Sequence, residues 1–195
     1  MQETIIDLIR HGEPVGGRRY RGYGVDDPLS EKGWQQMWQA VAAHTPWDQI
    51  ITSPLLRCQA FAAELAARHD IPLAQEPQFR EVGFGVWEGR SREELQAQEA
   101  QAYREFYDDP VNNRPAGSEP LVDFIDRVTT AYDRLVLGYA AQHCLVVAHA
   151  GVMRAIIAHV LGAPASSLYR IQVAHAGQCR IRHNERGGML EMLGQ

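Results

Sequence analysis

The chain has 195 residues, of which 45% are hydrophobic and 22% are charged. This length predicts one domain over residues 1–195 with an ordinary hydrophobic core, and the composition excludes a disordered chain. Its 19 basic and 24 acidic side chains give a formal net charge of −5. Because nucleic-acid-binding proteins present a broad positive surface, this balance argues against that class.

Cysteine usage and the N-terminal sequence bear on location. The three cysteines are scattered and form no CxxC pair, which argues against a disulfide framework or a zinc ribbon and fits a reducing compartment. The N-terminal segment is acidic where a signal peptide is basic, and no apolar run reaches the ~18 residues of a membrane span. We therefore expect a cytoplasmic protein without membrane contact.

The first half of the chain alternates β-rich and helical segments. Residues 4–9 have the apolar, β-branched character of a buried strand, and a long loop follows Arg10-His11-Gly12. Ser30 is predicted to cap a helix of about 15 residues. The pattern then predicts a strand at 48–53, a helix at 55–68 and a strand at 72–75.

The second half continues this alternation. Residues 79–89 are irregular and rich in glycine and aromatic residues. The pattern next predicts helices at 91–108 and 121–141, a strand at 144–148 and a helix from about Gly151 to about Leu161. The tail is predicted to form strands joined by a hairpin turn at Gly187-Gly188. Strands separated by helices predict an α/β fold, a three-layer α/β/α sandwich with a mainly parallel central sheet and antiparallel additions near the C-terminus.

Two histidines directly follow predicted strands. His11 ends the first strand, and His149 stands between an apolar strand and a helix. Because ligands of open α/β sheets bind beyond the carboxyl ends of the strands, we expect these two histidines to converge. Arg10 and Arg57 supply guanidinium groups, and the helix after His149 offers free N–H groups to an anion. The pattern therefore predicts a small cationic pocket sized for a phosphoryl group.

Such a pocket needs a nucleophile and a proton donor. An imidazole nitrogen can attack phosphorus directly, which divides one displacement into two through a phosphohistidine. The leaving oxygen then needs a proton, and Glu81 is the candidate donor because aromatic neighbours would favour its neutral form. The alternative is that Glu81 only pairs with Arg80.

Other charged residues near these segments have less specific patterns. Arg21 lies in an arginine-rich loop that is either solvated or in contact with substrate. His175 lies in a second Ala-His-Ala-Gly sequence, but a strand-like run follows it rather than a helix. We therefore favour a packed or surface role for His175.

Five segments carry a resemblance that covers about residues 4–160. They are residues 8–13, 26–33, 52–58, 81–89 and 147–151. In this order they resemble the histidine phosphatase superfamily, which includes the cofactor-dependent phosphoglycerate mutases. The resemblance implies His11 as nucleophile, Glu81 as proton donor, and Arg10, Arg57 and His149 as phosphate ligands. It implies no metal and no other cofactor.

The resemblance also narrows the expected activity. Trp87-Glu88-Gly89 resembles the small phosphatases of the superfamily, and residues 12–17 look most like the α-ribazole phosphatases. We expect a metal-independent phosphomonoester hydrolase acting on α-ribazole 5′-phosphate or another small phosphorylated metabolite. The alternatives are a phosphoglycerate-type mutase and a non-catalytic module that binds a phosphorylated ligand. The sequence leaves the oligomeric state open, with a homodimer among the options.

The chain departs from the family pattern at three places. Pro14 stands where many members have Ser or Thr, and Gly17 stands where many have Asn. Ser118-Glu119 reverses the usual Glu-Ser order. These departures leave phosphate affinity and substrate identity open.

Overall fold

The structure, a computed structural model, describes residues 3–42 and 45–194. Its strands form one sheet in the order β3-β2-β4-β1-β5-β6. The strands are β1 (Thr4–Arg10), β2 (Gln49–Thr52), β3 (Leu73–Gln75), β4 (His143–Ala148), β5 (Gln178–Asn184) and β6 (Gly187–Gly194). The α-helices are α1 (Glu31–Val41), α2 (Leu56–His69), α3 (Arg92–Gln98), α4 (Ala100–Asp108), α5 (Leu121–Gly138) and α6 (Ala150–Leu161). The short 3₁₀ helices in the described ranges are η1 (Pro77–Phe79), η2 (Gly85–Trp87) and η3 (Ala165–Arg170).

The sheet is mixed, as the sequence predicts. β1 pairs in parallel with β4, β4 with β2, and β2 with β3. β5 runs antiparallel to β1, and β6 runs antiparallel to β5. The antiparallel pairs lie at the C-terminal end of the chain, which confirms the α/β fold with a mainly parallel sheet.

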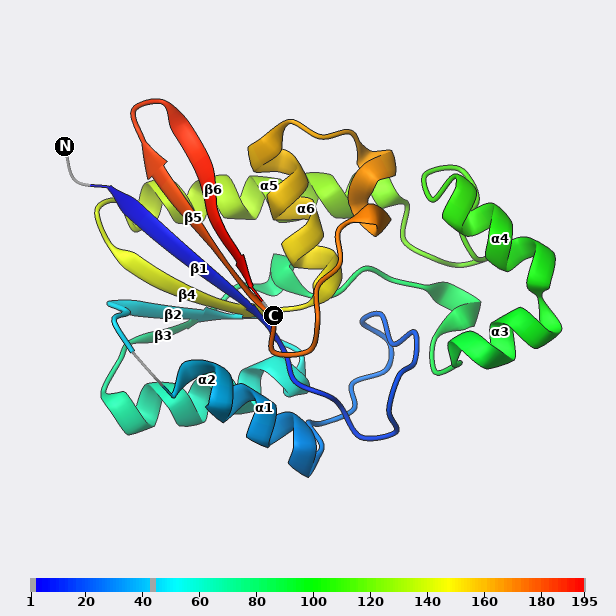
Figure 1. The fold of residues 1–195 in the computed structure, drawn as a ribbon, viewed down its shortest axis with the longest axis horizontal. Helices are drawn as coiled ribbons and strands as arrows, with labels where there is room; N and C mark the ends of the chain where they lie inside the picture. The colour runs from blue at the N-terminus through cyan, green and yellow to red at the C-terminus, as the bar shows by residue number, and fades with distance from the viewer. Residues whose placement is uncertain (1–2, 43–44, 195) are drawn as a thin grey trace.

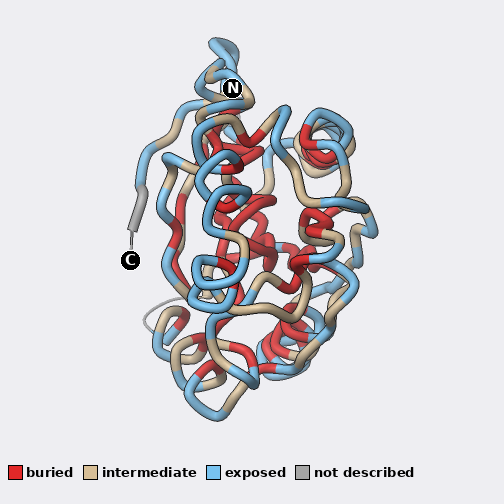
Figure 2. Tube along the Cα trace, turned by 90° about the vertical axis from the view of Figure 1, so that its right-hand side faces the viewer, coloured by how far each residue is buried: buried red, intermediate tan, exposed pale blue. Residues whose placement is uncertain are grey.

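Helices cover both faces of the sheet and so make three layers (Figure 1). α1 and α2 lie on one face, over a core that includes Met37, Phe61 and Leu65. α5 and α6 lie on the other, over a core that includes Phe124 and Ile156. The buried part of the trace runs through the middle of the molecule, between exposed outer surfaces (Figure 2). Within the described ranges, no helix combines the length and the apolar character needed to cross a membrane.

The helical segment predicted at 91–108 is two helices, α3 and α4. Ser91 begins α3 with a capping box, in which its side chain and that of Glu94 each accept a backbone N–H. Glu99 ends it at φ −137°, and its carboxylate accepts hydrogen bonds from Trp87 Nε1 at 3.0 Å and from Arg90. These tertiary contacts explain a break that helical periodicity alone does not reveal. The two helices lie beyond the carboxyl ends of β1 and β4 (Figure 1).

The C-terminal hairpin turns two residues earlier than predicted. Glu185 and Arg186 form the turn, and Asn184 pairs with Gly187. The Asn184 side chain accepts a hydrogen bond from the Arg186 backbone N–H at 2.9 Å, which closes the turn as an Asx motif. Gly187, at φ +101°, is therefore the first residue of β6 rather than the tip of the hairpin.

A buried carboxylate in β1 ties the sheet together. Asp7 accepts hydrogen bonds from Arg180 Nε at 2.7 Å, Trp47 Nε1 at 2.8 Å and His143 Nε2 at 2.8 Å. Burial alone would raise the pKa of Asp7, but the hydrogen bonds from Arg180, His143 and Trp47 outweigh it and hold this pKa well below its usual range. The cluster links β1, β4, β5 and the segment before β2.

We expect Asp7→Asn to lower the free energy of unfolding near neutral pH by about 3 kcal/mol, because Arg180 and His143 lose their charged partner. Since the pKa of Asp7 is lower in the folded protein than in the unfolded chain, its contribution is complete above about pH 5 and declines as the pH falls below about 4. Urea unfolding at a series of pH values measures both effects. An unfolding free energy that falls equally with acid in the parent and the variant would contradict this assignment.

Candidate active site

The two predicted histidines meet because their strands are neighbours. Arg10 in β1 is in register with Ala148 in β4, so the residues that follow emerge side by side at the carboxyl edge of the sheet. The His11 backbone N–H donates to the Ala148 carbonyl at 2.9 Å. The rings of His11 and His149 lie edge to face, 5.2 Å between centroids. The predicted convergence is therefore present.

Backbone contacts fix the ring of His11 and its protonation. Nδ1 lies 2.7 Å from the Gly12 carbonyl oxygen, which can only accept, so Nδ1 carries the proton and Nε2 keeps its lone pair. Burial, and then the charges of Arg10 and Arg57, hold the pKa of His11 well below its ordinary value. A Cβ on Gly12 would lie 2.2 Å from the Gly33 carbonyl oxygen, so only glycine fits between β1 and α1.

Two guanidinium groups flank this histidine. Arg10 Nη1 donates to the Val173 carbonyl at 2.7 Å, and burial lowers the pKa of Arg10 to about 10. Arg57, 1% exposed, donates to the carbonyls of Gly22 at 2.7 Å and Val25 at 3.1 Å. The Nε atoms of both arginines are buried without a partner among the described residues. Buried donors without acceptors are costly, so both point to an anionic ligand.

His149 is fully buried and faces other protein groups. Its Nε2 lies 2.7 Å from Ser53 Oγ and 3.6 Å from Cys58 Sγ. Burial, followed by the charges of Arg57 and His11, holds the pKa of His149 well below its ordinary value. In this structure His149 packs against His11 and Ser53, and its role as a phosphate ligand stays a prediction.

Glu81 reaches the start of α6 from the opposite wall. Its carboxylate accepts the backbone N–H of Gly151 at 3.2 Å and that of Val82 at 3.0 Å. Arg127 holds the segment in place by donating to the Glu81 carbonyl at 3.1 Å, and Arg127 Nε donates to Glu119 Oε1 at 2.6 Å. The reversed Ser-Glu pair therefore contributes Glu119 to a clamp behind Glu81.

Arg10, His11, Arg57 and Glu81 line a common cavity of about 1210 Å³. Its wall includes His11, Glu81 and nine basic side chains, against two carboxylates, those of Glu13 and Glu81. The basic residues are Arg10, Arg18, Arg19, Arg21, Lys32, Arg57, Arg92, Arg154 and Arg170. An acidic chain thus presents a locally cationic cavity, as the sequence predicts, but this cavity is larger than the predicted pocket for one phosphoryl group, and His149 is not among its lining residues.

His175 and Arg154 are among the residues of this wall that sequence reasoning did not assign to the site. His175 lies 5.9 Å from His11 between ring centroids, and burial, then Arg10, lowers its pKa to about 4. It comes near because β5 pairs with β1, which brings Ala176 N within 3.3 Å of the His11 carbonyl oxygen. Arg154, on α6, donates through Nε to the Ile171 carbonyl at 2.8 Å. The repeated Ala-His-Ala-Gly sequence was the available signal for His175.

The loop after His11 holds the other departures from the family pattern. Pro14 forms a β-bridge with Leu29, and Gly17 adopts φ +72° in the turn that follows. Neither is among the residues that line the cavity. Arg21 does line it, and its Nε donates to Asp27 Oδ2 at 2.8 Å. This ion pair joins two parts of the loop beside the cavity.

Comparison with known proteins identifies the class. Residues 6–195 match the sequence profile of the histidine phosphatase superfamily (branch 1), so the chain belongs to that superfamily. It is 33% identical over 171 residues to the adenosylcobalamin/α-ribazole phosphatase of Salmonella typhimurium LT2, covering 85% of this chain and 84% of that protein. It is 28% identical to phosphoserine phosphatase 1 of Hydrogenobacter thermophilus, covering 95% and 90%. The crystal structure of the α-ribazole phosphatase from Shigella flexneri superposes with a TM-score of 0.85 at 28% identity, covering 98% and 96%.

Proposed function

We propose that this protein is a metal-independent phosphomonoester hydrolase that works through a phosphohistidine at His11. The observation that carries the proposal is the neutral imidazole of His11, whose Nε2 lies beside two guanidinium groups with buried Nε donors that have no acceptor among the described residues. We further propose α-ribazole 5′-phosphate, or another small phosphorylated metabolite, as the substrate. The similarity to α-ribazole phosphatases supports this choice.

The first step transfers the phosphoryl group to the protein. The Nε2 lone pair of His11 attacks phosphorus, the bond to the leaving oxygen breaks, and Glu81 gives that oxygen a proton. Arg10 and Arg57 neutralise the equatorial oxygens as charge shifts onto them. The Nδ1–H bond to the Gly12 carbonyl at 2.7 Å stabilises the imidazolium character that develops on the ring.

The second step returns His11 to its starting state. Glu81, now a carboxylate, takes a proton from water as the water oxygen attacks phosphorus. The N–P bond breaks, inorganic phosphate leaves, and Glu81 is again protonated. Each proton that Glu81 gives in the first step is therefore recovered in the second.

A phosphomonoester panel that includes α-ribazole 5′-phosphate tests the proposal, with His11→Ala as the blank. The expected result is phosphate release by the parent protein that does not require 2,3-bisphosphoglycerate. Exclusive isomerisation of phosphoglycerate would assign a mutase. Ligand binding that survives His11→Ala, without turnover by the parent, would assign a binding module.

We also propose that the enzyme acts in the cytoplasm. The three cysteines are free and buried, and burial raises the pKa of the Cys144 thiol to about 12. Unpaired thiols persist in a reducing compartment, which supports this location.

Gly151→Ala is expected to lower kcat by about tenfold to a hundredfold, because a small displacement of a catalytic group is enough for such a loss. A Cβ at this position would lie 2.2 Å from Glu81 Oε1 and would push the carboxyl away from α6. Thermal stability should not fall in parallel, since alanine favours a helix more than glycine does. Gly138→Ala, with nothing within 4 Å of its added Cβ, is the matched control. An unchanged kcat in Gly151→Ala would show that Glu81 does not act from this position.

A further inference from the structure

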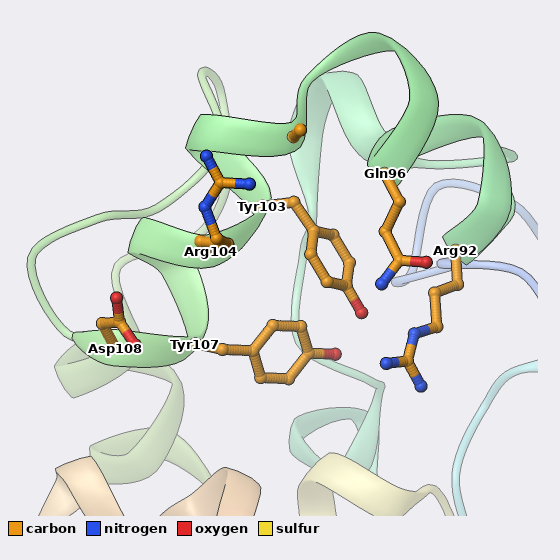
Figure 3. Close-up of a pocket in the computed structure, with 7 residues that line it drawn as sticks. Arg92, Gln96, Tyr103, Arg104, Tyr107 and Asp108 are labelled. Carbon is orange, nitrogen blue, oxygen red and sulfur yellow. The ribbon is translucent and has the colours of Figure 1, made fainter.

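A second cavity, of about 540 Å³, lies between α3 and α4. Arg92 and Tyr107 line both this cavity and the catalytic one, so the two spaces adjoin. The side chains of Arg92, Gln96, Tyr103 and Tyr107 point toward a common space (Figure 3). None of these residues takes part in the proposed phosphoryl transfer, so the second cavity is available for another part of the substrate.

Tyr107 presents a fixed aromatic ring at the junction of the cavities. Its hydroxyl is 2.7 Å from that of Tyr20. Its ring lies nearly perpendicular to those of Phe106, at 5.0 Å, and Tyr169, at 5.9 Å. The side chain is nevertheless 43% exposed. A large aromatic side chain that is held in one orientation and left exposed is suited to stacking on a ligand ring.

Arg92 supplies hydrogen-bond donors on the other side of the cavity. Its guanidinium lies 5.9 Å from the centre of the Tyr103 ring, and within the described residues it forms no ion pair. Asp108, the carboxylate of this cavity, lies across from it (Figure 3). The free donors of Arg92 can therefore meet acceptor atoms at the edge of a ligand ring.

We propose that the α3–α4 cavity binds a planar heteroaromatic ring carried by the leaving group. The substrate then extends from the phosphate beside His11 to a ring stacked on Tyr107. This inference rests on the proposed function, because it assigns the second cavity to the same substrate. A small anionic leaving group would bind the arginines of the catalytic cavity, but it would gain no binding energy from an exposed tyrosine ring.

Two matched substrates test this subsite. Ribose 5-phosphate and α-ribazole 5′-phosphate share the phosphate ester and the ribose, and only the second carries a planar ring. The parent enzyme is expected to show a kcat/KM ratio of about ten or more in favour of the ring-bearing substrate, which is the range of one stacking interaction. Tyr107→Ala should bring this ratio close to one, and Tyr107→Phe, which keeps the ring, should retain most of it.

Two results would overturn the subsite. One is an equal kcat/KM for the two substrates in the parent enzyme, and the other is a Tyr107→Ala variant that loses activity on both to the same extent. Ribose 5-phosphate carries no planar ring, so its hydrolysis tests the proposed hydrolase activity independently of the α3–α4 cavity. If neither ester is hydrolysed, the phosphomonoester panel decides on the proposed function, and titration with phosphate-free α-ribazole decides separately on the cavity. Binding that Tyr107→Ala weakens about tenfold supports the subsite, and absence of binding by the parent rejects it.

Discussion

Replacing His11 with alanine is expected to lower kcat by at least about 10⁴-fold, because the substrate then has no group to which its phosphoryl can be transferred. The fold should be unaffected. The Nδ1 bond of His11 is made to its own neighbour, Gly12, so the variant keeps every side-chain hydrogen bond that joins distant segments of the described residues. Loss of activity with an unchanged unfolding free energy is the expected combination.

Rapid quenching in alkaline detergent with labelled substrate measures the intermediate itself. The parent protein should yield a protein-bound phosphate that is labile to acid and stable to base, as an N–P bond is, and His11→Ala should yield none. His159→Ala is the matched control, since His159 is paired with Asp133 at 2.9 Å and is not part of the cavity wall. An acid-labile phosphoprotein in the His11→Ala variant would overturn the assignment of the nucleophile.

Glu81→Gln is expected to reduce phosphoryl transfer from alkyl phosphates by about 10²–10³-fold, because the amide cannot give a proton to the leaving oxygen. The size of the loss should depend on the leaving group. p-Nitrophenolate departs as a stable anion and needs no proton, so transfer from p-nitrophenyl phosphate should fall much less. The glutamine oxygen still accepts a hydrogen bond where Glu81 accepts from Gly151 at 3.2 Å, which keeps the local structure.

Single-turnover kinetics with alkyl phosphates and with p-nitrophenyl phosphate distinguish proton donation by Glu81 from substrate positioning. The transfer step is compared between parent and variant, since Glu81 also activates water in the later step. A loss of the same size for alkyl and p-nitrophenyl phosphates would show that Glu81 positions the substrate rather than protonating it.

The sequence carried enough information to predict the centre of the site. A strand ending in Arg10-His11 and a strand ending in His149 are both visible as apolar runs, and parallel strands place their carboxyl ends together. The sequence indicates less clearly which strands pair with each other in the sheet. His175 lies beside His11 only because β5 pairs with β1, and no local pattern specifies that pairing.

For the same reason, local sequence patterns could not predict the contacts that support the site. Arg127 in α5 holds the Glu81 segment through backbone carbonyls and through Glu119. Backbone carbonyls are present at every residue, so the sequence does not mark the ones that receive a guanidinium. The break at Glu99 between α3 and α4 likewise depends on its contacts with Trp87 and Arg90.

The segment at 171–177 has a consequence for when activity arises during synthesis. Its carbonyls receive Arg154 and Arg10, and its Gly177 carbonyl receives the Arg10 backbone N–H at 3.0 Å. A nascent chain that has emerged only as far as η3 contains His11, Glu81 and His149 but not these acceptors. We therefore expect the catalytic centre to be completed only after β5 has joined β1, so that a ribosome-bound fragment folds in part and remains inactive.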